Sequence, residues 1–294
     1  MFSFKFGYDR TAQIEQLNPT TEHSQICNLL AGYEFPWDIT RSLELAMLKT
    51  YCIPSISKLL DNTGEFHHHT QKRYDDTGLL VAEILKWGYD SDRGKESIRR
   101  MNMIHGHYQI SNADFLYVLS TFIYEPIRWN KNFGWRLFTE TEKLAIFYFW
   151  QAVGRKMQIA NIPATYDEFA RYNQDYECQN FVYADSNRRV GNSTLNLFLS
   201  WFPAFSRPLL KPCVKALFDE RSLEAFGWSS PSPWIHNLVK SALKLRGQIS
   251  KLLLPRKKPD FYTDSKLKSY PHGYELEDLG PKRMLDKLNN ANIE

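Results

Sequence analysis

The stretch from Asp114 to Trp129, DFLYVLSTFIYEPIRW, is apolar on almost every side of the helix that its pattern predicts. A helix at the surface of a soluble protein keeps one polar face, whereas a helix that is apolar all round must be covered by others. Ser111 and Asp114, three residues apart, resemble a capping box at its start. Pro126 is expected to kink or end the helix, because proline lacks the N–H that the helix ladder needs. The stretch therefore predicts a helix in the middle of a bundle.

A second apolar and aromatic helix, EKLAIFYFWQAVGRKM, follows Thr139 and Glu142, which have the spacing of another capping box. Helical periodicity continues through nearly all of residues 1–258, and no segment alternates convincingly as a strand would. Residues 259–294 are polar and rich in Pro, Tyr and Lys. We expect one all-α domain, a single-domain helical bundle over residues 1–258, followed by a polar extended or disordered tail.

Composition and charge narrow the classes of function. Hydrophobic residues make up 43% and charged residues 24% of the 294 residues, as in globular proteins. The net charge of +4 is a mild excess, so we expect no nucleic-acid partner. The four cysteines form no CxxC pair, which does not fit a zinc or iron–sulfur centre. The sequence shows no secretory signal and no charge-free apolar stretch of membrane-spanning length, so we expect a cytoplasmic or peripherally membrane-associated protein.

Residues 240–258, KSALKLRGQISKLLLPRKK, interleave leucines with cations. This pattern predicts an amphipathic helix with a basic end. Peripheral contact with a membrane surface, or with an acidic partner, is one interpretation. A solvated last helix, whose cations favour its C-terminal end, is the simpler one.

The helix expected to begin at Thr70 combines an apolar stripe with a charged residue. Leu80 and Ile84 share a face that, extended toward the start of the helix, also holds Arg73 and Thr77. A guanidinium on a buried face needs an anionic partner. That partner is either Asp or Glu from another helix or a bound anion such as a propionate, and the spacing favours neither.

Two histidines in IRRMNMIHGHYQIS, residues 98–111, lie two positions apart and so point to different sides of a helix. His105 closes an apolar stripe with Ile98 and Met101, whereas His107 does not. A lone histidine on an apolar face is usually a hydrogen-bonded core residue. The alternative is an imidazole that ligates haem iron in an apolar, aromatic pocket.

Glu125 lies among aromatic residues, with Arg128 three positions later. An internal ion pair is the simpler role for a carboxylate in such a setting. A general base is the alternative.

Taken together, five stretches resemble the catalytic domain of the rubber oxygenases and the endoplasmic-reticulum-bound fungal oxygenases, most closely the fungal branch. The resemblance extends over about residues 51–255 and rests on the ordered series rather than on any one motif. The stretches are YCIPSISKLL, KRYDDTGLLVAEI, IRRMNMIHGHYQIS, DFLYVLSTFIYEPIRW and FYFWQAVGRKMQIANIP.

The resemblance implies an all-α fold that encloses a non-covalent haem b and cleaves carbon–carbon double bonds of isoprenoid chains with O2. The family motif, an Arg, three residues and a Thr, is matched by Arg73 and Thr77, and its haem-ligating histidine by His105, 28 residues after Thr77. The chain would then be a haem-b-dependent oxygenase of a hydrophobic, isoprenoid or unsaturated substrate. Arg73, Thr77 and Glu125 are its candidate catalytic residues.

Two departures accompany the resemblance. Asp76 stands where the rubber oxygenases have a lysine between the Arg and the Thr, and the N-terminal membrane anchor of the fungal relatives is not seen in this sequence. The alternative function is a haem-binding or apolar-lipid-binding protein that has the same fold but no turnover.

Overall fold

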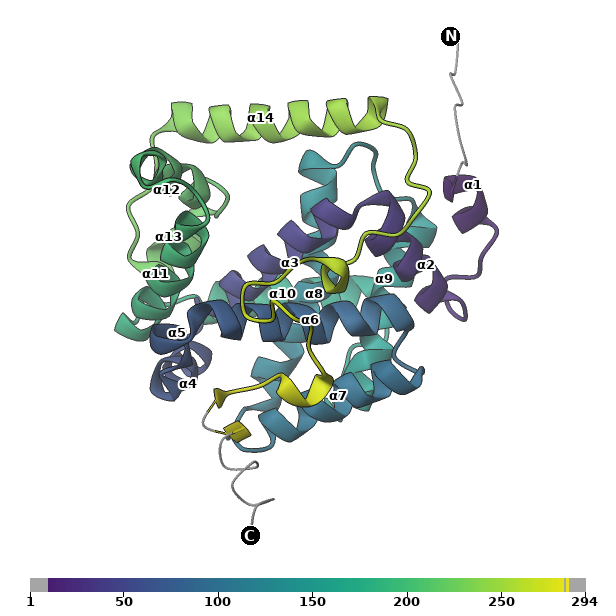
Figure 1. The fold of residues 1–294 in the computed structure, drawn as a ribbon, viewed down its shortest axis with the longest axis horizontal. Coiled ribbons are helices and arrows are strands. Elements are labelled where there is room, and N and C mark those ends of the chain that lie inside the picture. Colours follow the sequence, from purple (N-terminus) through teal and green to yellow (C-terminus); the bar gives the residue numbers. More distant parts are fainter. Residues whose placement is uncertain (1–9, 283, 286–294) are drawn as a thin grey trace.

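The computed structural model describes residues 10–282 and 284–285, and all regular secondary structure in these residues is helical (Figure 1). The predicted all-α fold is thereby confirmed. The α-helices are α1 (Arg10–Glu15), α2 (His23–Leu29), α3 (Pro36–Thr50), α4 (Pro54–Thr63), α5 (Glu65–His68), α6 (Thr70–Trp87), α7 (Asp92–His105), α8 (Asn112–Phe133), α9 (Glu140–Lys156), α10 (Tyr166–Asn180), α11 (Asp185–Ser200), α12 (Arg207–Lys215), α13 (Glu220–Phe226) and α14 (Pro233–Leu252). Shorter turns are the π-helical η1 (Leu30–Glu34) and the 3-10 turns η2 (Ala204–Ser206), η3 (Tyr262–Asp264) and η4 (Leu276–Asp278).

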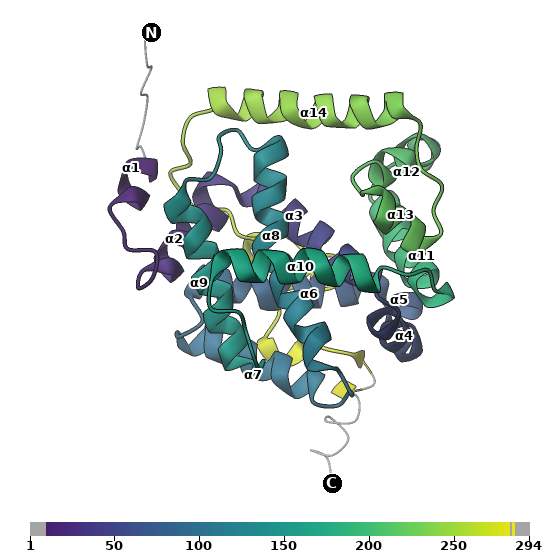
Figure 2. The same cartoon turned by 180° about the vertical axis from the view of Figure 1, so that it is seen from behind.

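Helix α8 lies at the centre of the bundle, where α3, α9, α10 and α14 contact it (Figures 1 and 2). Its start is capped as predicted by Ser111, whose hydroxyl accepts a 3.0 Å hydrogen bond from the Asp114 N–H. The Asp114 carboxylate does not complete a capping box; it accepts from the hydroxyls of Ser55 and Tyr176 instead.

Pro126 does not end α8, which continues to Phe133. A proline inside a helix removes one backbone hydrogen bond and crowds the preceding turn. Here Pro126 and most of the residues around it are buried on all sides. We infer that burial of this apolar helix outweighs the lost hydrogen bond.

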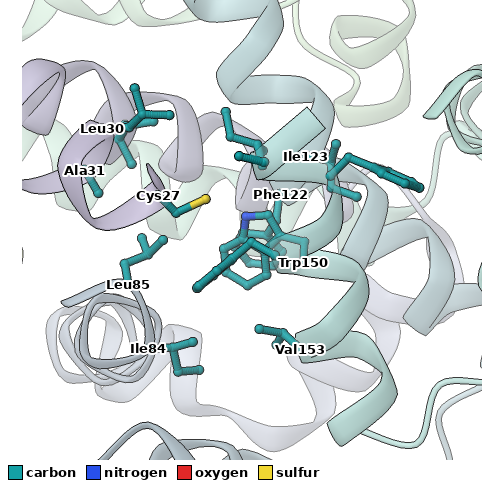
Figure 3. Close-up of a cluster of buried hydrophobic side chains, with 14 of the residues drawn as sticks. Cys27, Leu30, Ala31, Ile84, Leu85, Phe122, Ile123, Trp150 and Val153 are labelled. Atoms are coloured by element: carbon teal, nitrogen blue, oxygen red, sulfur yellow. The ribbon is translucent and has the colours of Figure 1, made fainter. Parts of the chain in front are cut away.

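Helices α2, α6, α8 and α9 meet in an apolar core (Figure 3). Phe122 of α8 and Trp150 of α9 stack there, with ring centroids 4.8 Å apart. The predicted capping box at Thr139 and Glu142 begins α9 and is complete on both sides. Phe122 of this core lines both of the cavities described below.

Residues 259–281, here called the C-terminal strap, differ from the expected tail. The strap is largely extended, but it lies along α6 and α7 and belongs to the helical domain (Figure 1). Phe261, Leu267, Leu276 and Leu279 of the strap are buried. These four apolar residues are too widely spaced to give a helical period, so the segment reads as polar in the sequence. In the structure each of them is nevertheless buried and holds the strap against the helices.

Polar contacts also hold the strap. Arg100 of α7 donates from Nε to the Leu279 carbonyl at 2.7 Å and from Nη2 to the Glu277 carbonyl at 2.6 Å. Asp76 of α6 accepts from Tyr270 and from the Gly280 N–H. Asp76 therefore faces the strap, and its side chain has a structural role here.

One edge of the molecule is formed by α14, which contacts α8 and α12, while α7 lies at the opposite edge (Figures 1 and 2). None of the described helices combines the length and apolar character needed to cross a membrane. Helices α6 and α7 pack against each other, and this pairing positions the candidate site.

Candidate functional site

Arg73 and Thr77 lie one turn apart on α6, as predicted. Arg73 donates from Nη1 to the Thr77 hydroxyl, which itself donates to the Arg73 carbonyl at 3.0 Å. The guanidinium also lies over the ring of Phe66, 5.7 Å from its centroid. Among the described residues, no carboxylate forms an ion pair with Arg73. The charge of this part-buried group is therefore available to an anion in the cavity that it lines.

His105 is the last residue of α7, and its ring meets Phe115 edge-on with centroids 5.4 Å apart. Its Nδ1 is buried and has no hydrogen-bond partner. Burial, helped by the nearby charge of Arg73, lowers the pKa of His105 to about 4. The imidazole is therefore neutral at pH 7, which is the form that coordinates a metal ion.

Two other histidines of this fold have a hydrogen-bond partner for at least one ring nitrogen and serve as a comparison for His105. The buried His23 uses both ring nitrogens, Nδ1 at 3.0 Å from the Thr20 carbonyl and Nε2 at 2.5 Å from the Tyr89 hydroxyl. The exposed His107 places Nδ1 2.7 Å from the Met103 carbonyl. Only His105 of these three combines burial with an unpartnered nitrogen. His105 and His107 thus lie in different environments, as their spacing predicted.

His105, Arg73 and Thr77 line one cavity, here called the His105 chamber. Its empty volume is about 1500 Å³, a figure that includes space at its open mouth. Much of the remaining lining is apolar, including Leu80, Met101, Ile104, Phe115, Val118 and Trp150. An apolar chamber with a neutral imidazole and an unpaired guanidinium fits a haem with its anionic propionates.

A second cavity, the Glu44 chamber, has an empty volume of about 870 Å³ and is lined by Glu44, Tyr74 and Phe198 among others. Arg73 and Thr77 line both chambers, and therefore stand at the boundary between them. Phe261 and Tyr262 of the C-terminal strap form part of the wall.

Glu44 is a site residue that the sequence does not reveal. Its Oε1 accepts a hydrogen bond from the Tyr74 hydroxyl and lies 2.7 Å from the Arg41 Nη2. Burial raises the pKa of Glu44 to about 7, although Arg41 acts in the opposite direction. In the sequence, Arg41 and Glu44 have the spacing of an ordinary surface ion pair, and only the fold places the carboxylate in a cavity.

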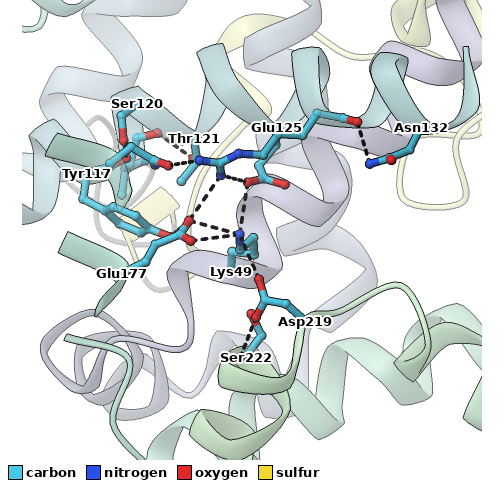
Figure 4. Close-up of polar contacts among 12 residues, drawn as sticks. Lys49, Tyr117, Ser120, Thr121, Glu125, Asn132, Glu177, Asp219 and Ser222 are labelled. Atoms are coloured by element: carbon cyan, nitrogen blue, oxygen red, sulfur yellow. Dashed lines mark hydrogen bonds and ion pairs between the residues drawn. The ribbon is translucent and has the colours of Figure 1, made fainter. Parts of the chain in front are cut away.

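The structure does not bring Glu125 together with Arg73, Thr77 and His105. Glu125 lines neither chamber. Instead its Oε1 lies 3.1 Å from the Lys49 Nζ and accepts from Arg128 (Figure 4). This placement favours the internal ion pair over the general base.

The substitution Glu44→Gln is expected to remove a pH dependence from stability. Because the pKa of Glu44 rises from 4.5 to about 7 on folding, the folded protein holds a proton between these values that the unfolded chain releases. The contribution is fully present below pH 4.5 and is lost as the pH rises through 7. Its size is on the order of 3 kcal/mol.

Thermal unfolding from pH 5 to pH 8 tests this expectation. The melting temperature of the wild type should fall with rising pH relative to that of Glu44→Gln, which keeps an oxygen to accept from Tyr74. Parallel curves for the two proteins would show that Glu44 has an ordinary carboxyl environment.

Comparison with known proteins gives this architecture a family. The sequence profile described as ER-bound oxygenase mpaB/B'/Rubber oxygenase, catalytic domain, matches residues 45–242. That span contains α4 to α13 and so includes Arg73, Thr77 and His105. The resemblance inferred from the sequence is thereby confirmed.

Individual relatives agree with the profile. The chain is 28% identical to "ER-bound oxygenase mpaB'" of Penicillium brevicompactum over a 320-residue alignment that covers 86% of this chain and 76% of the relative. It is 32% identical over 189 residues to "ER-bound oxygenase mpaB" of the same fungus, covering 58% of this chain and 48% of the relative. For "ER-bound oxygenase mpaB" of Penicillium roqueforti (strain FM164) the identity is 29% over 222 residues, with 69% and 74% covered.

Proposed function

The chain belongs to the family of the ER-bound oxygenase mpaB/B' and rubber oxygenase catalytic domains, and from this premise we propose that it is a haem-b-dependent oxygenase of a hydrophobic, isoprenoid or unsaturated substrate. Membership of the family supports an oxygenase, and hence an oxidoreductase. The single observation that carries the haem is the buried, unpartnered Nδ1 of a neutral His105 in an apolar chamber.

In this proposal His105 would hold the haem through its iron. Burial keeps its imidazole unprotonated, and the edge of Phe115 orients the ring. Arg73 would bind a propionate, because its guanidinium has no described carboxylate partner and can grip a carboxylate with two N–H groups. Thr77 holds Nη1 of Arg73 and so fixes the direction of the guanidinium. When bound, haem supplies an iron centre at which dioxygen is activated.

The Glu44 chamber is the proposed place for the substrate chain. It adjoins the His105 chamber at Arg73 and Thr77, so a ligand there would reach the boundary between the two. Its apolar walls exclude water and suit a hydrocarbon chain. Glu44 and Tyr74 give it a polar end, where Glu44 holds a proton up to a pH of about 7.

Absorption spectroscopy and oxygen uptake test the proposal. Protein expressed with a supply of haem precursor should show a Soret band, and its absence would rule out the haem. The haem-loaded protein should then consume O2 with farnesol as a probe and yield carbonyl products, detectable by mass spectrometry. A Soret band without oxygen uptake, over a series of isoprenoid probes, would favour the haem-binding protein without turnover.

A further inference from the structure

Helix α14 exposes its most apolar side to solvent. Trp234, Leu238, Leu245, Ile249 and Leu252 are 66%, 53%, 61%, 52% and 85% exposed. Their spacing of three, four and seven residues places all five on one face of the helix. A helix that only needs to cover a soluble core turns such a face inward.

The opposite side of α14 contacts the protein, and part of that side is polar. Arg246 donates from Nη1 to both oxygens of the Asp38 carboxylate at 2.7 Å. Gly247 is buried so closely that an added Cβ would lie 2.7 Å from the Phe133 carbonyl oxygen. His236 lies with Nδ1 3.2 Å from the Ala216 carbonyl. These contacts fix the rotation of α14 about its own axis. The apolar stripe, on the other side of the helix, therefore faces outward.

The charged side chains in and around α14 are all positive. Residues 225–259 contain seven Lys and Arg residues and no Asp or Glu, although the whole chain carries a net charge of only +4. Lys240, Lys244 and Lys251 are exposed, and none of them forms an ion pair with a described carboxylate. The positive residues 256–258 follow the end of the helix after three intervening residues. An apolar stripe bordered by unpaired lysines is complementary to an anionic, apolar surface.

More exposed apolar residues follow the helix in the sequence or belong to its neighbourhood in the fold. Leu253 and Leu254 follow it directly and are exposed. Phe205 and Leu209, also exposed, belong to η2 and α12, and α12 contacts α14 (Figure 2). Several large exposed apolar residues on one helix of a folded protein mark an interaction site.

We propose that α14 docks the protein on the surface of an anionic lipid bilayer, with the helix lying in the plane of the interface. Trp234 and the leucines enter the boundary between head groups and acyl chains, and the lysines contact lipid phosphates and carboxylates. A second copy of this chain fits less well, because a two-fold contact would bring the lysines of two acid-free helices together. This docking surface is separate from the His105 and Glu44 chambers and does not depend on haem.

Sedimentation of the full chain with vesicles tests the proposal. It should pellet with phosphatidylcholine vesicles that contain phosphatidylserine, and much less with phosphatidylcholine alone or at high salt. The double substitution Leu245→Gln, Ile249→Gln should weaken binding by about 100-fold, because two buried aliphatic side chains are lost from the interface. The triple substitution Lys240→Glu, Lys244→Glu, Lys251→Glu should remove the preference for phosphatidylserine.

Trp87→Gln serves as the control, because Trp87 is 53% exposed and ends α6, next to α7 at the edge opposite α14 (Figure 1). It should bind vesicles like the wild type. Wild-type protein that stays in the supernatant with phosphatidylserine vesicles would overturn the proposal. So would a concentration-dependent dimer in light scattering that is lost in the Leu245→Gln, Ile249→Gln variant, since that result would assign the stripe to a second copy.

Discussion

Replacing His105 by alanine (His105→Ala) is expected to abolish haem binding, so that protein made with a haem supply shows no Soret band. The imidazole is neutral at pH 7, lines the larger chamber and has a buried nitrogen that no described group uses. Changing a group that merely orients a ligand already costs about 10–100-fold in affinity, so loss of the ligand itself should cost more than about 100-fold. Titration of haem into the purified variant measures this loss.

His107→Ala is the matched control. His107 is two positions away, exposed, and uses Nδ1 for the Met103 carbonyl, so its loss should leave the Soret band intact. Thermal unfolding of both variants checks that the fold survives. A band that persists in His105→Ala, or that disappears in His107→Ala, would mean that another residue holds the haem.

The all-helical fold could be predicted because its signals are local. The capping box at Thr139 connects two residues three positions apart, and it is complete in the structure. The effect of Pro126 could not be predicted, because it depends on how much apolar surface α8 buries against helices distant in sequence. The docking of the C-terminal strap depends in the same way on helices far away in the chain.

In the candidate site, too, local features could be predicted from the sequence and contacts between distant helices could not. Arg73 and Thr77 lie on one helix, so their spacing was enough to place them together. Their partners could not be inferred: the absence of a described carboxylate at Arg73 and the burial of Glu44 both follow from the arrangement of α3 and α6. Glu125 lies in a polar network rather than in a cavity, which agrees with the internal ion pair that its neighbourhood in the sequence made the simpler role.

That network surrounds Lys49 of α3 (Figure 4). Its Nζ lies 3.1 Å from Glu125, 3.0 Å from Glu177 and 3.5 Å from Asp219. Burial acts to lower the pKa of Lys49, but the three carboxylates outweigh it and hold this pKa above its usual value. The ammonium group therefore joins α3 to α8, α10 and the start of α13.

Lys49→Met, which keeps the apolar stem of the side chain but not its charge, is expected to lower stability by about 3–5 kcal/mol, because it leaves the buried carboxylates of Glu125 and Glu177 with Arg128 as the one cation described beside them. At roughly 2–4 °C per kcal/mol this corresponds to a drop in melting temperature of about 10 °C. Lys143→Met is the control; Lys143 pairs with the exposed Glu140 at 2.7 Å, and such a surface pair is worth at most about 1 kcal/mol.

The pH dependence of Lys49→Met separates lost charge from altered packing. A cluster of buried carboxylates that has lost one of its two cations is relieved by taking up a proton, so the deficit relative to the wild type should be smaller at pH 5 than at pH 8. A packing defect would give the same deficit at both values. If Lys49→Met melts within about 2 °C of the wild type at pH 8, less than 1 kcal/mol is lost, and the network contributes specificity of pairing rather than stability.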